Sequence, residues 1–246
     1  MTTATVGRLV RNPMLAALAR RATGPERTHI ARIEGLRGEL EASAAVLERV
    51  DFGAGERVPL SDVTHHAGVT VTQTVGDFCR RSSVSPLWSR LLFHLVRETR
   101  PAHGLELGTA LGISAAYQGA ALELNGHGRL VTIEGAAPLA EIARRNLERL
   151  GISRVEVVRG RFVEALPAVL DGLRPLDYAY LDGHHDGRAT LEYFEMLLDA
   201  VDGPAVLVFD DIGISTGMRR AWEAIGRHPR VALAVSLRKL GVCEVR

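Results

Sequence analysis

The sequence LELGTALGIS at residues 105–114, followed by LVTIE at residues 130–134, carries the strongest structural signal in the chain. Gly108 and Gly112 lie where an apolar run gives way to a helical pattern. Glycine there permits a tight turn and lets a ligand approach the backbone closely. A helix that begins at such a turn offers unpaired N–H groups to an anionic group. The spacing is GxxxG and not the GxGxxG of dinucleotide-binding proteins, which disfavours an NAD-dependent oxidoreductase.

Glu134 ends the second of these two apolar runs. An acidic residue at this place can hydrogen-bond the two hydroxyls of a ribose. Taken alone, a two-glycine turn fits an ordinary strand-to-helix connection, and a lone glutamate fits a solvated strand end. Together in one strand–helix–strand unit, the glycines and Glu134 predict a cofactor that bears a nucleoside.

Short apolar runs and helical stretches alternate after residue 100. The runs are GLELG (104–108), LVTIE (130–134), VEVVRG (155–160), LDYAYLD (176–182) and AVLVFDD (205–211). Near-continuous apolar strands separated by helices are typical of a parallel sheet that is covered on both faces. We therefore expect five parallel strands, with ligands at their carboxyl ends.

The C-terminal tail differs from this alternation. VALAVSLR (231–238) and GVCEVR (241–246) are separated by two residues only, which permits an antiparallel hairpin but not a parallel crossover. The predicted fold class is thus α/β, a Rossmann-like, doubly wound sheet of seven strands whose last strand is antiparallel, with a helical cap at the N-terminus.

The first hundred residues look mostly helical. Apolar residues at three- and four-residue steps predict an amphipathic helix over 26–50, residues 51–85 look loop-like or extended, and a new helix is expected from Pro86. We expect residues 1–84 to form a helical cap or lid, and residues 85–246 to form the cofactor-binding domain. The apolar face of the predicted helix could also pair with a second copy of the chain.

Composition excludes several classes of protein. The chain has 246 residues, with 30 Lys+Arg against 29 Asp+Glu and a formal charge of +1, which argues against nucleic-acid binding driven by charge. No run reaches the roughly 18–20 apolar residues of a membrane helix. Arg20 and Arg21 interrupt the apolar patch near the N-terminus, so no signal peptide is expected. We expect a cytoplasmic protein without a nucleic-acid or membrane partner, and the Arg-rich, Lys-poor composition indicates a GC-rich bacterial origin.

Acidic residues and histidines follow the fourth and fifth predicted strands. Asp182, His184 and His185 come after the fourth strand, and Asp210 and Asp211 after the fifth. Neighbouring parallel strands would bring these side chains to one edge of the sheet. Like charges packed together need a compensating charge, and oxygen ligands with open positions suit Mg²⁺ or Mn²⁺. Each residue alone also fits a helix cap or a solvated side chain.

At these motifs the sequence resembles the class I S-adenosylmethionine-dependent methyltransferases. It is most similar to the small-molecule O-methyltransferases of the catechol type and to a related group that acts on sugar hydroxyls of natural products. The resemblance covers about residues 85–246. The cofactor-binding residues that it implies are Glu106, Gly108, Gly112, Ser114, Glu134, Gly160, Phe162 and Asp182.

The resemblance also implies the metal ligands and the general base. The divalent ion would be held by Asp182, Asp210 and Asp211, although the catechol type often has Asn at the last position. His185 stands where the family has its base, which is often lysine. Histidine suits proton removal at neutral pH. The run Gly160-Arg161-Phe162 departs from the family's polar pair near the adenine, and Phe162 is expected to pack on that ring.

These inferences combine into one predicted activity. We expect an O-methyltransferase that uses S-adenosylmethionine and a divalent metal, most simply Mg²⁺, to methylate a hydroxyl of a small molecule in secondary metabolism. Two alternatives stay open, namely a metal-independent N- or O-methyltransferase and a cofactor-binding scaffold without turnover. In this family, segments such as the one that contains His65 and His66 often close over the acceptor.

Overall fold

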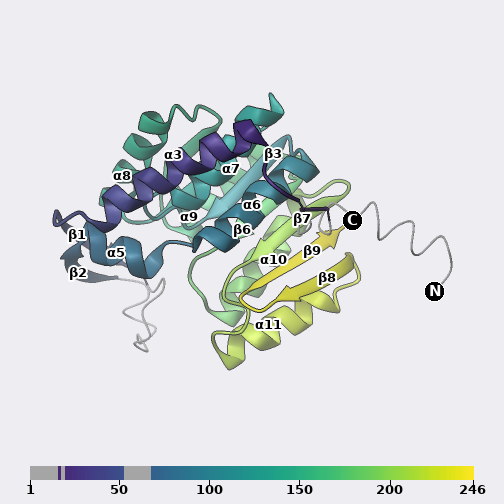
Figure 1. Ribbon diagram of the computed structural model, residues 1–246. Helices are drawn as coiled ribbons and strands as arrows, with labels where there is room; N and C mark the ends of the chain where they lie inside the picture. Colours follow the sequence, from purple (N-terminus) through teal and green to yellow (C-terminus); the bar gives the residue numbers. More distant parts are fainter. Residues whose placement is uncertain (1–15, 18–19, 53–67) are drawn as a thin grey trace.

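The computed structural model describes residues 16–17, 20–52 and 68–246 (Figure 1). The N-terminal elements are α3 (Gly24–Glu41), β1 (Val46–Asp51), β2 (Val69–Thr74), α5 (Val75–Ser82) and α6 (Pro86–Thr99). The chain continues with β3 (His103–Leu107), α7 (Ile113–Asn125), β4 (Arg129–Glu134), α8 (Ala137–Leu150), β5 (Val155–Arg159) and α9 (Phe162–Leu173). It ends with β6 (Tyr178–Leu181), α10 (Gly187–Ala200), β7 (Ala205–Phe209), α11 (Thr216–Gly226), β8 (Val231–Leu237) and β9 (Leu240–Val245). His65 and His66 lie outside the described residues.

In the described part of the chain, seven strands form the main sheet in the order β5-β4-β3-β6-β7-β9-β8. The strands β3 to β7 are parallel, whereas β9 is antiparallel to both β7 and β8. This arrangement confirms the predicted Rossmann-like sheet with a reversed last strand. Because Phe209 pairs with Gly241, the β8–β9 turn stands beside the carboxyl end of β7.

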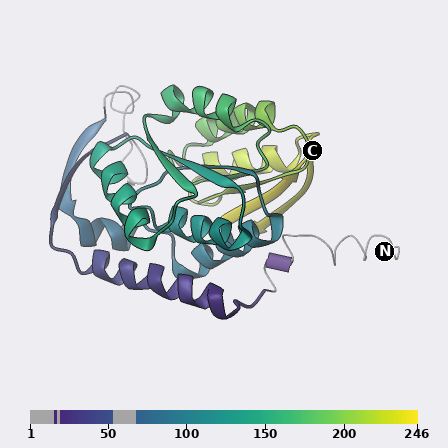
Figure 2. The same cartoon turned by 90° about the horizontal axis from the view of Figure 1, so that it is seen from above.

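Helices cover both faces of this sheet (Figure 2). The helices α6, α7 and α8 pack on one face with α3 outside them, and α9, α10 and α11 pack on the other. Side chains alternate between the two cores along each strand, so that on β7 Val206 and Val208 face one core and Leu207 and Phe209 face the other. Among the helices of the described residues, none combines the length and the apolar character needed to cross a membrane.

The N-terminal part departs from the predicted helical cap. The helix expected over residues 26–50 ends at Glu41, and residues 46–51 form β1, which pairs with β2 as an antiparallel hairpin. The segment 51–85, expected to be loop-like or extended, contains β2 but also the helix α5. Buried and exposed residues alternate along β1, as in a strand with one covered face. Both the helix over 46–50 and the absence of a helix in 51–85 were therefore wrong.

Glu26 ties α3 to the sheet domain. Its side chain is 1% exposed and accepts hydrogen bonds from Arg20 at 2.6 Å, from Arg97 at 2.9 Å and from the Thr23 backbone N–H at 2.7 Å. Burial by itself raises the pKa of Glu26, but these partners outweigh burial and lower the pKa to about 2. Since Arg97 belongs to α6, this ion pair holds the N-terminal helix against the helix that leads into the sheet.

The substitution Glu26→Gln should lower the free energy of unfolding by about 3 kcal/mol at neutral pH, because two arginines lose a buried partner. The difference between the wild type and the variant should shrink as the pH falls from about 5 towards 2. In that range Glu26 first takes up a proton in the unfolded chain, and in the folded protein it does so only near pH 2. Urea unfolding of both proteins across this range measures the difference.

The matched control is Glu39→Gln, an exposed position on the same helix. It should change the free energy of unfolding by less than about 1 kcal/mol at every pH. A Glu26→Gln difference that stays constant from neutral pH down to about pH 2.5 would contradict the role assigned to this carboxylate.

Candidate active site

The turn between β3 and α7 depends on two glycines. Gly108 has φ +99°, and a Cβ there would lie 2.1 Å from the carbonyl oxygen of Asp182. Gly112 has φ +81°, and a Cβ there would come within 3.2 Å of Ala143 on α8. Only glycine combines this left-handed backbone with such close contacts. The turn thus lies directly against the end of β6, and Ser114 at the start of α7 lines the space above the sheet.

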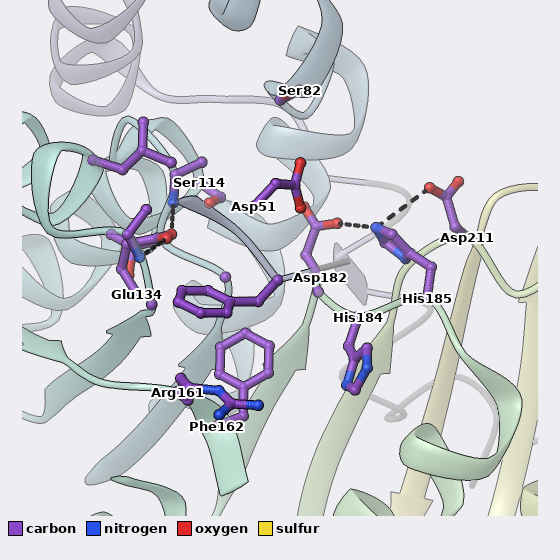
Figure 3. A pocket seen from close by; sticks show the side chains of 18 of the residues that line it. Asp51, Ser82, Ser114, Glu134, Arg161, Phe162, Asp182, His184, His185 and Asp211 are labelled. Atoms are coloured by element: carbon purple, nitrogen blue, oxygen red, sulfur yellow. Dashed lines mark hydrogen bonds and ion pairs between the residues drawn. The ribbon is translucent and has the colours of Figure 1, made fainter. Parts of the chain in front are cut away.

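Glu134 stands beside this turn at the end of β4 (Figure 3). Its two carboxylate oxygens accept hydrogen bonds from the N–H groups of Ala110 and Ala136, both at 2.9 Å. Burial raises the pKa of Glu134, and these two backbone donors oppose the shift. The carboxylate is therefore held in one orientation, and each of its oxygens has a second lone pair with which it can accept a hydrogen bond from a ligand hydroxyl.

Glu106 lies beneath the glycine turn. Its side chain has no solvent exposure and accepts hydrogen bonds from Gln118 Nε2 at 2.8 Å and from Thr132 Oγ1 at 2.7 Å. Burial raises its pKa to about 7, although these hydrogen bonds oppose the shift. Glu106 thus connects β3 to α7 and β4, one layer below the residues that could touch a ligand.

Phe162 and Arg161 form a further wall at the end of β5. The ring of Phe162 packs over Gly183, where a Cβ would come within 2.7 Å of it. It also meets the ring of Tyr193 edge-on, with centroids 5.9 Å apart. Arg161 lies over the ring of Phe52, with 5.3 Å between the guanidinium carbon and the ring centroid. Because Phe52 directly follows β1, the N-terminal hairpin contributes to this wall.

Acidic side chains meet where β6 and β7 end. The Tyr180 hydroxyl donates to Asp182 Oδ2 at 2.9 Å and lies 3.3 Å from Asp210 Oδ2. His185 lies between two carboxylates, with its Nε2 3.7 Å from Asp182 Oδ1 and 3.9 Å from Asp211 Oδ2 (Figure 3). The convergence of Asp182, Asp210, Asp211 and His185 is as expected from the strand order, whereas His184 points away from them and its Nδ1 lies 3.0 Å from the Tyr193 hydroxyl.

Lys239 reaches the same place from the turn between β8 and β9. Its ammonium lies 2.9 Å from Asp210 Oδ2 and 3.7 Å from Asp211 Oδ1. The backbone fixes the turn, because the Ile212 N–H donates to the Lys239 carbonyl at 3.1 Å. The chain itself therefore supplies a cation to two of the three carboxylates. We call Asp182, Asp210 and Asp211 together with Lys239 the acidic cluster.

One cavity of about 710 Å³ joins the glycine turn to the acidic cluster. Its volume is in the range of sites for small molecules and cofactors. Glu134 and Ser114 line one side, His185, Asp211 and Lys239 line the other, and residues of the β1–β2 hairpin and of α5 complete the wall. A nucleoside-bearing ligand at the turn and a second small molecule at the cluster would share this space.

Comparison with known proteins identifies the family. A family model described as a methyltransferase domain matches residues 105–212. A catechol O-methyltransferase of Niastella koreensis is 33% identical over 137 residues, which cover 55% of this chain and 60% of that protein. A catechol O-methyltransferase of Mycobacterium tuberculosis is 31% identical over 162 residues, which cover 61% of this chain and 71% of that protein. The chain belongs to the class I S-adenosylmethionine-dependent O-methyltransferases.

The fold of this O-methyltransferase agrees with a solved relative over nearly the whole chain. The O-methyltransferase of Bacillus cereus, in complex with SAH, has 21% sequence identity and a TM-score of 0.60. That match covers 99% of this chain and 97% of the other. By contrast, the sequence match spans only 60% of the length of the Niastella koreensis protein.

Most of the predicted site residues of the O-methyltransferase lie on the cavity wall. Those that line the cavity are Gly108, Ser114, Glu134, Phe162, Asp182, His185 and Asp211. Glu106 and Gly112 are not among the lining residues, and Gly160 lines a second hollow beside the cavity. Asp210 is 1% exposed and lies behind Asp211 and Lys239. Their assignment to cofactor and metal stays a prediction.

Burial dominates the electrostatics of the acidic cluster. It raises the pKa of Asp210 to about 7, and the charge of Asp182 adds to this shift while Lys239 opposes it. Burial also raises the pKa of Asp182 and of Asp211. Burial lowers the pKa of His185, although Asp211 and Asp210 oppose that shift. The cluster therefore favours fewer negative charges than three separate aspartates in water would carry.

The divalent metal that the resemblance implies does not fit this donor set as it is arranged. Such an ion needs carboxylate oxygens at about 2.0–2.6 Å. The oxygens of Asp210 and Asp211 instead face the ammonium of Lys239. Within residues 16–17, 20–52 and 68–246, no group of three or more His, Cys, Asp or Glu side chains is arranged to hold a metal ion. The positive charge in this cluster comes from the chain.

Sequence reasoning did not identify several residues of this site. Phe52 belongs to a region that resembles no family motif, and its contact with Arg161 joins segments more than a hundred residues apart. Arg49 and Asp51 form a buried ion pair at 2.8 Å on the cavity wall, at the boundary between the predicted helix over 26–50 and the segment predicted to be loop-like. Lys239 could have been noticed in the sequence, because it is the only lysine there.

The close approach of Gly108 to the end of β6 predicts that Gly108→Ala lowers the free energy of unfolding by more than about 3 kcal/mol, because the methyl group and the Asp182 carbonyl cannot occupy the same space. The control is Gly151→Ala, at another glycine with positive φ, +69°, but with no atom within 4 Å of the added Cβ. Its free energy of unfolding should fall by only about 1–2 kcal/mol, because the backbone alone is strained. Chemical unfolding measures both variants, and equal losses would contradict the steric explanation.

Proposed function

We propose that this O-methyltransferase transfers the methyl group of S-adenosylmethionine to a hydroxyl of a small molecule. The observation that carries the proposal is the single cavity in which Glu134 and the glycine turn face the same space as His185 and the acidic cluster. A cofactor site and a proton acceptor are thereby next to each other, as group transfer between two bound molecules requires.

The cofactor half of the site is supported by the side chains at the ends of β3, β4 and β5. The oriented carboxylate of Glu134 suits the ribose hydroxyls. Phe162 offers an aromatic face for the adenine, and the N-terminus of α7 offers N–H groups for the methionine carboxylate. The catechol O-methyltransferase relatives and the SAH complex of the Bacillus cereus protein agree with this assignment.

His185 is the group that we propose as the general base. When bound, S-adenosylmethionine supplies a methyl group on a sulfonium, which the acceptor oxygen takes as the carbon–sulfur bond breaks. The His185 ring lies on the cavity wall with 17% of its side chain exposed, so its Nε2 can receive the proton that the acceptor hydroxyl loses. Asp182 and Asp211 flank that nitrogen and stabilise the protonated ring.

The arrangement of the acidic cluster favours the metal-independent alternative over the metal-assisted reaction predicted from the sequence, because Lys239 already compensates Asp210 and Asp211. The N-terminal part adds Arg49, Phe78 and Arg81 to the cavity wall, which suits a small, polar, aromatic or anionic molecule. A role in secondary metabolism and a cytoplasmic location stay predictions.

Calorimetric titration should show that the protein binds S-adenosylmethionine but not NAD⁺. Glu134 suits the ribose of one nucleoside, and the glycine turn has the spacing GxxxG and not the GxGxxG that holds the pyrophosphate of a dinucleotide. Glu134→Gln should weaken this binding by roughly 10- to 100-fold, because a charged hydrogen-bond acceptor is lost. The matched control Glu148→Gln, on the exposed side of α8, should bind like the wild type. If the wild type does not bind S-adenosylmethionine, the proposed function is wrong.

The substitution His185→Asn should reduce kcat for methyl transfer by roughly 100- to 10,000-fold, the usual contribution of a general base, and leave the affinity for S-adenosylmethionine unchanged. Release of S-adenosylhomocysteine with a panel of phenols and sugar alcohols measures turnover. The control His127→Asn changes a histidine at the opposite end of the sheet. Cofactor binding without turnover of any acceptor would instead support the scaffold alternative, and full activity of His185→Asn would exclude this base.

A further inference from the structure

Lys239 is the only lysine of the sequence, since the other 29 of the 30 basic residues are arginine. It stands in the short turn between β8 and β9, which the pairing of Phe209 with Gly241 places beside the carboxyl end of β7. The hydrogen bond from the Ile212 N–H to the Lys239 carbonyl fixes the turn against the segment that follows Asp211. Sheet pairing and a backbone contact thus both direct this side chain to the acidic cluster.

Lys239 compensates charges that the rest of the site leaves uncompensated. Asp210 is 1% exposed and Asp182 lies half-buried beside it, and the Tyr180 hydroxyl bridges their oxygens. Lysine presents a compact charge with three N–H donors. At 2.9 Å from Asp210 and 3.7 Å from Asp211, the ammonium lies against the oxygens that a divalent cation would need.

We propose that the ammonium of Lys239 takes the place of the divalent cation in this O-methyltransferase and binds the acceptor oxygen during methyl transfer. The inference rests on the proposed function and adds the group that holds the acceptor. Lys239 lines the same cavity as His185, and 37% of its side chain is exposed. Two of its donors face carboxylates, and the third is available to an oxygen in the cavity.

This arrangement narrows the class of acceptor. A divalent ion can chelate two neighbouring oxygens at once, whereas the one N–H donor of Lys239 that does not face a carboxylate can bind one oxygen. The acceptor that fits is therefore a molecule with one acidic hydroxyl, such as a phenol, whose oxygen gains negative charge as His185 removes its proton. A vicinal second hydroxyl is not required for binding.

The test measures Mn²⁺ binding by electron paramagnetic resonance in the wild type and in Lys239→Gln. The wild type should leave Mn²⁺ free at about 1 mM, whereas Lys239→Gln should bind it roughly 100-fold or more tightly, because Asp210 and Asp211 then lose their cation. Lys239→Arg should behave like the wild type, since it keeps the charge. The matched control Arg238→Gln removes an exposed neighbouring charge and should also leave Mn²⁺ free.

A wild type that binds Mn²⁺ as tightly as Lys239→Gln would overturn the proposal. A second measurement needs no variant. Reductive methylation with ¹³C-formaldehyde labels Lys239 and the terminal amine only, because the sequence has no other lysine. The Lys239 signal should stay sharp when Mn²⁺ is added, and its loss by paramagnetic broadening would place a metal in the cluster.

Measurements of cofactor affinity and of turnover distinguish the role proposed for Lys239 from the proposed methyltransferase function. Lys239→Gln should keep the wild-type affinity for S-adenosylmethionine but lose kcat/KM for the acceptor by roughly 100-fold, with partial recovery in Lys239→Arg. Failure to bind S-adenosylmethionine would refute the proposed function whatever the Mn²⁺ result. Normal methyl transfer by a wild type that binds Mn²⁺ in the cluster would refute only the role of Lys239.

Discussion

Three carboxylates that meet at one edge of the sheet can all keep their negative charges only if a positive charge compensates them. In this protein the charge comes from the β8–β9 hairpin, because β9 enters the sheet between β7 and β8 and carries the preceding turn to the end of β7. The reversed last strand therefore completes the sheet and also positions a side chain of the acidic cluster at its edge. It places Lys239 beside Asp210 and Asp211, and with them it sets one side of the cavity.

The other side of the cavity depends on a steric constraint. The β3–α7 turn approaches the end of β6 so closely that residue 108 can carry no Cβ. This contact sets how far the turn and Glu134 lie from Asp182 and His185. The buried pair of Glu26 with two arginines then fixes α3, and through it the β1–β2 hairpin, whose Phe52 and Arg49 complete the wall. The sites proposed for cofactor and acceptor therefore share one cavity, and these contacts fix its walls.

Much of the fold could be predicted from the sequence, because each buried parallel strand is an apolar run and each is followed by a helix. The hairpin at the C-terminus followed from a two-residue connection. The helix expected over 26–50 failed because the apolar spacing of residues 46–50 fits a strand as well as a helix. What decides between them is pairing with residues 69–74, whose partners in β1 lie 18 to 28 positions earlier in the chain.

The candidate site could be predicted to a similar degree. Asp182, His185 and Asp211 were expected to converge because they follow neighbouring strands, and they do. The full burial of Glu106 could not be predicted from its position near a strand end. Side chains alternate between the two faces of that strand, and the Glu106 side chain lies in the core and not in the cavity. Lys239 was visible as the only lysine, but its partner depends on where the last hairpin joins the sheet.

The most direct measurement is a crystal structure of the wild-type protein grown with S-adenosylhomocysteine and Mn²⁺, with data collected at the Mn absorption edge. We expect S-adenosylhomocysteine between Glu134 and Phe162, Lys239 still paired with Asp210, and no anomalous peak in the acidic cluster. A Mn²⁺ peak held by Asp182, Asp210 and Asp211, with Lys239 displaced, would contradict a site in which lysine supplies the cation.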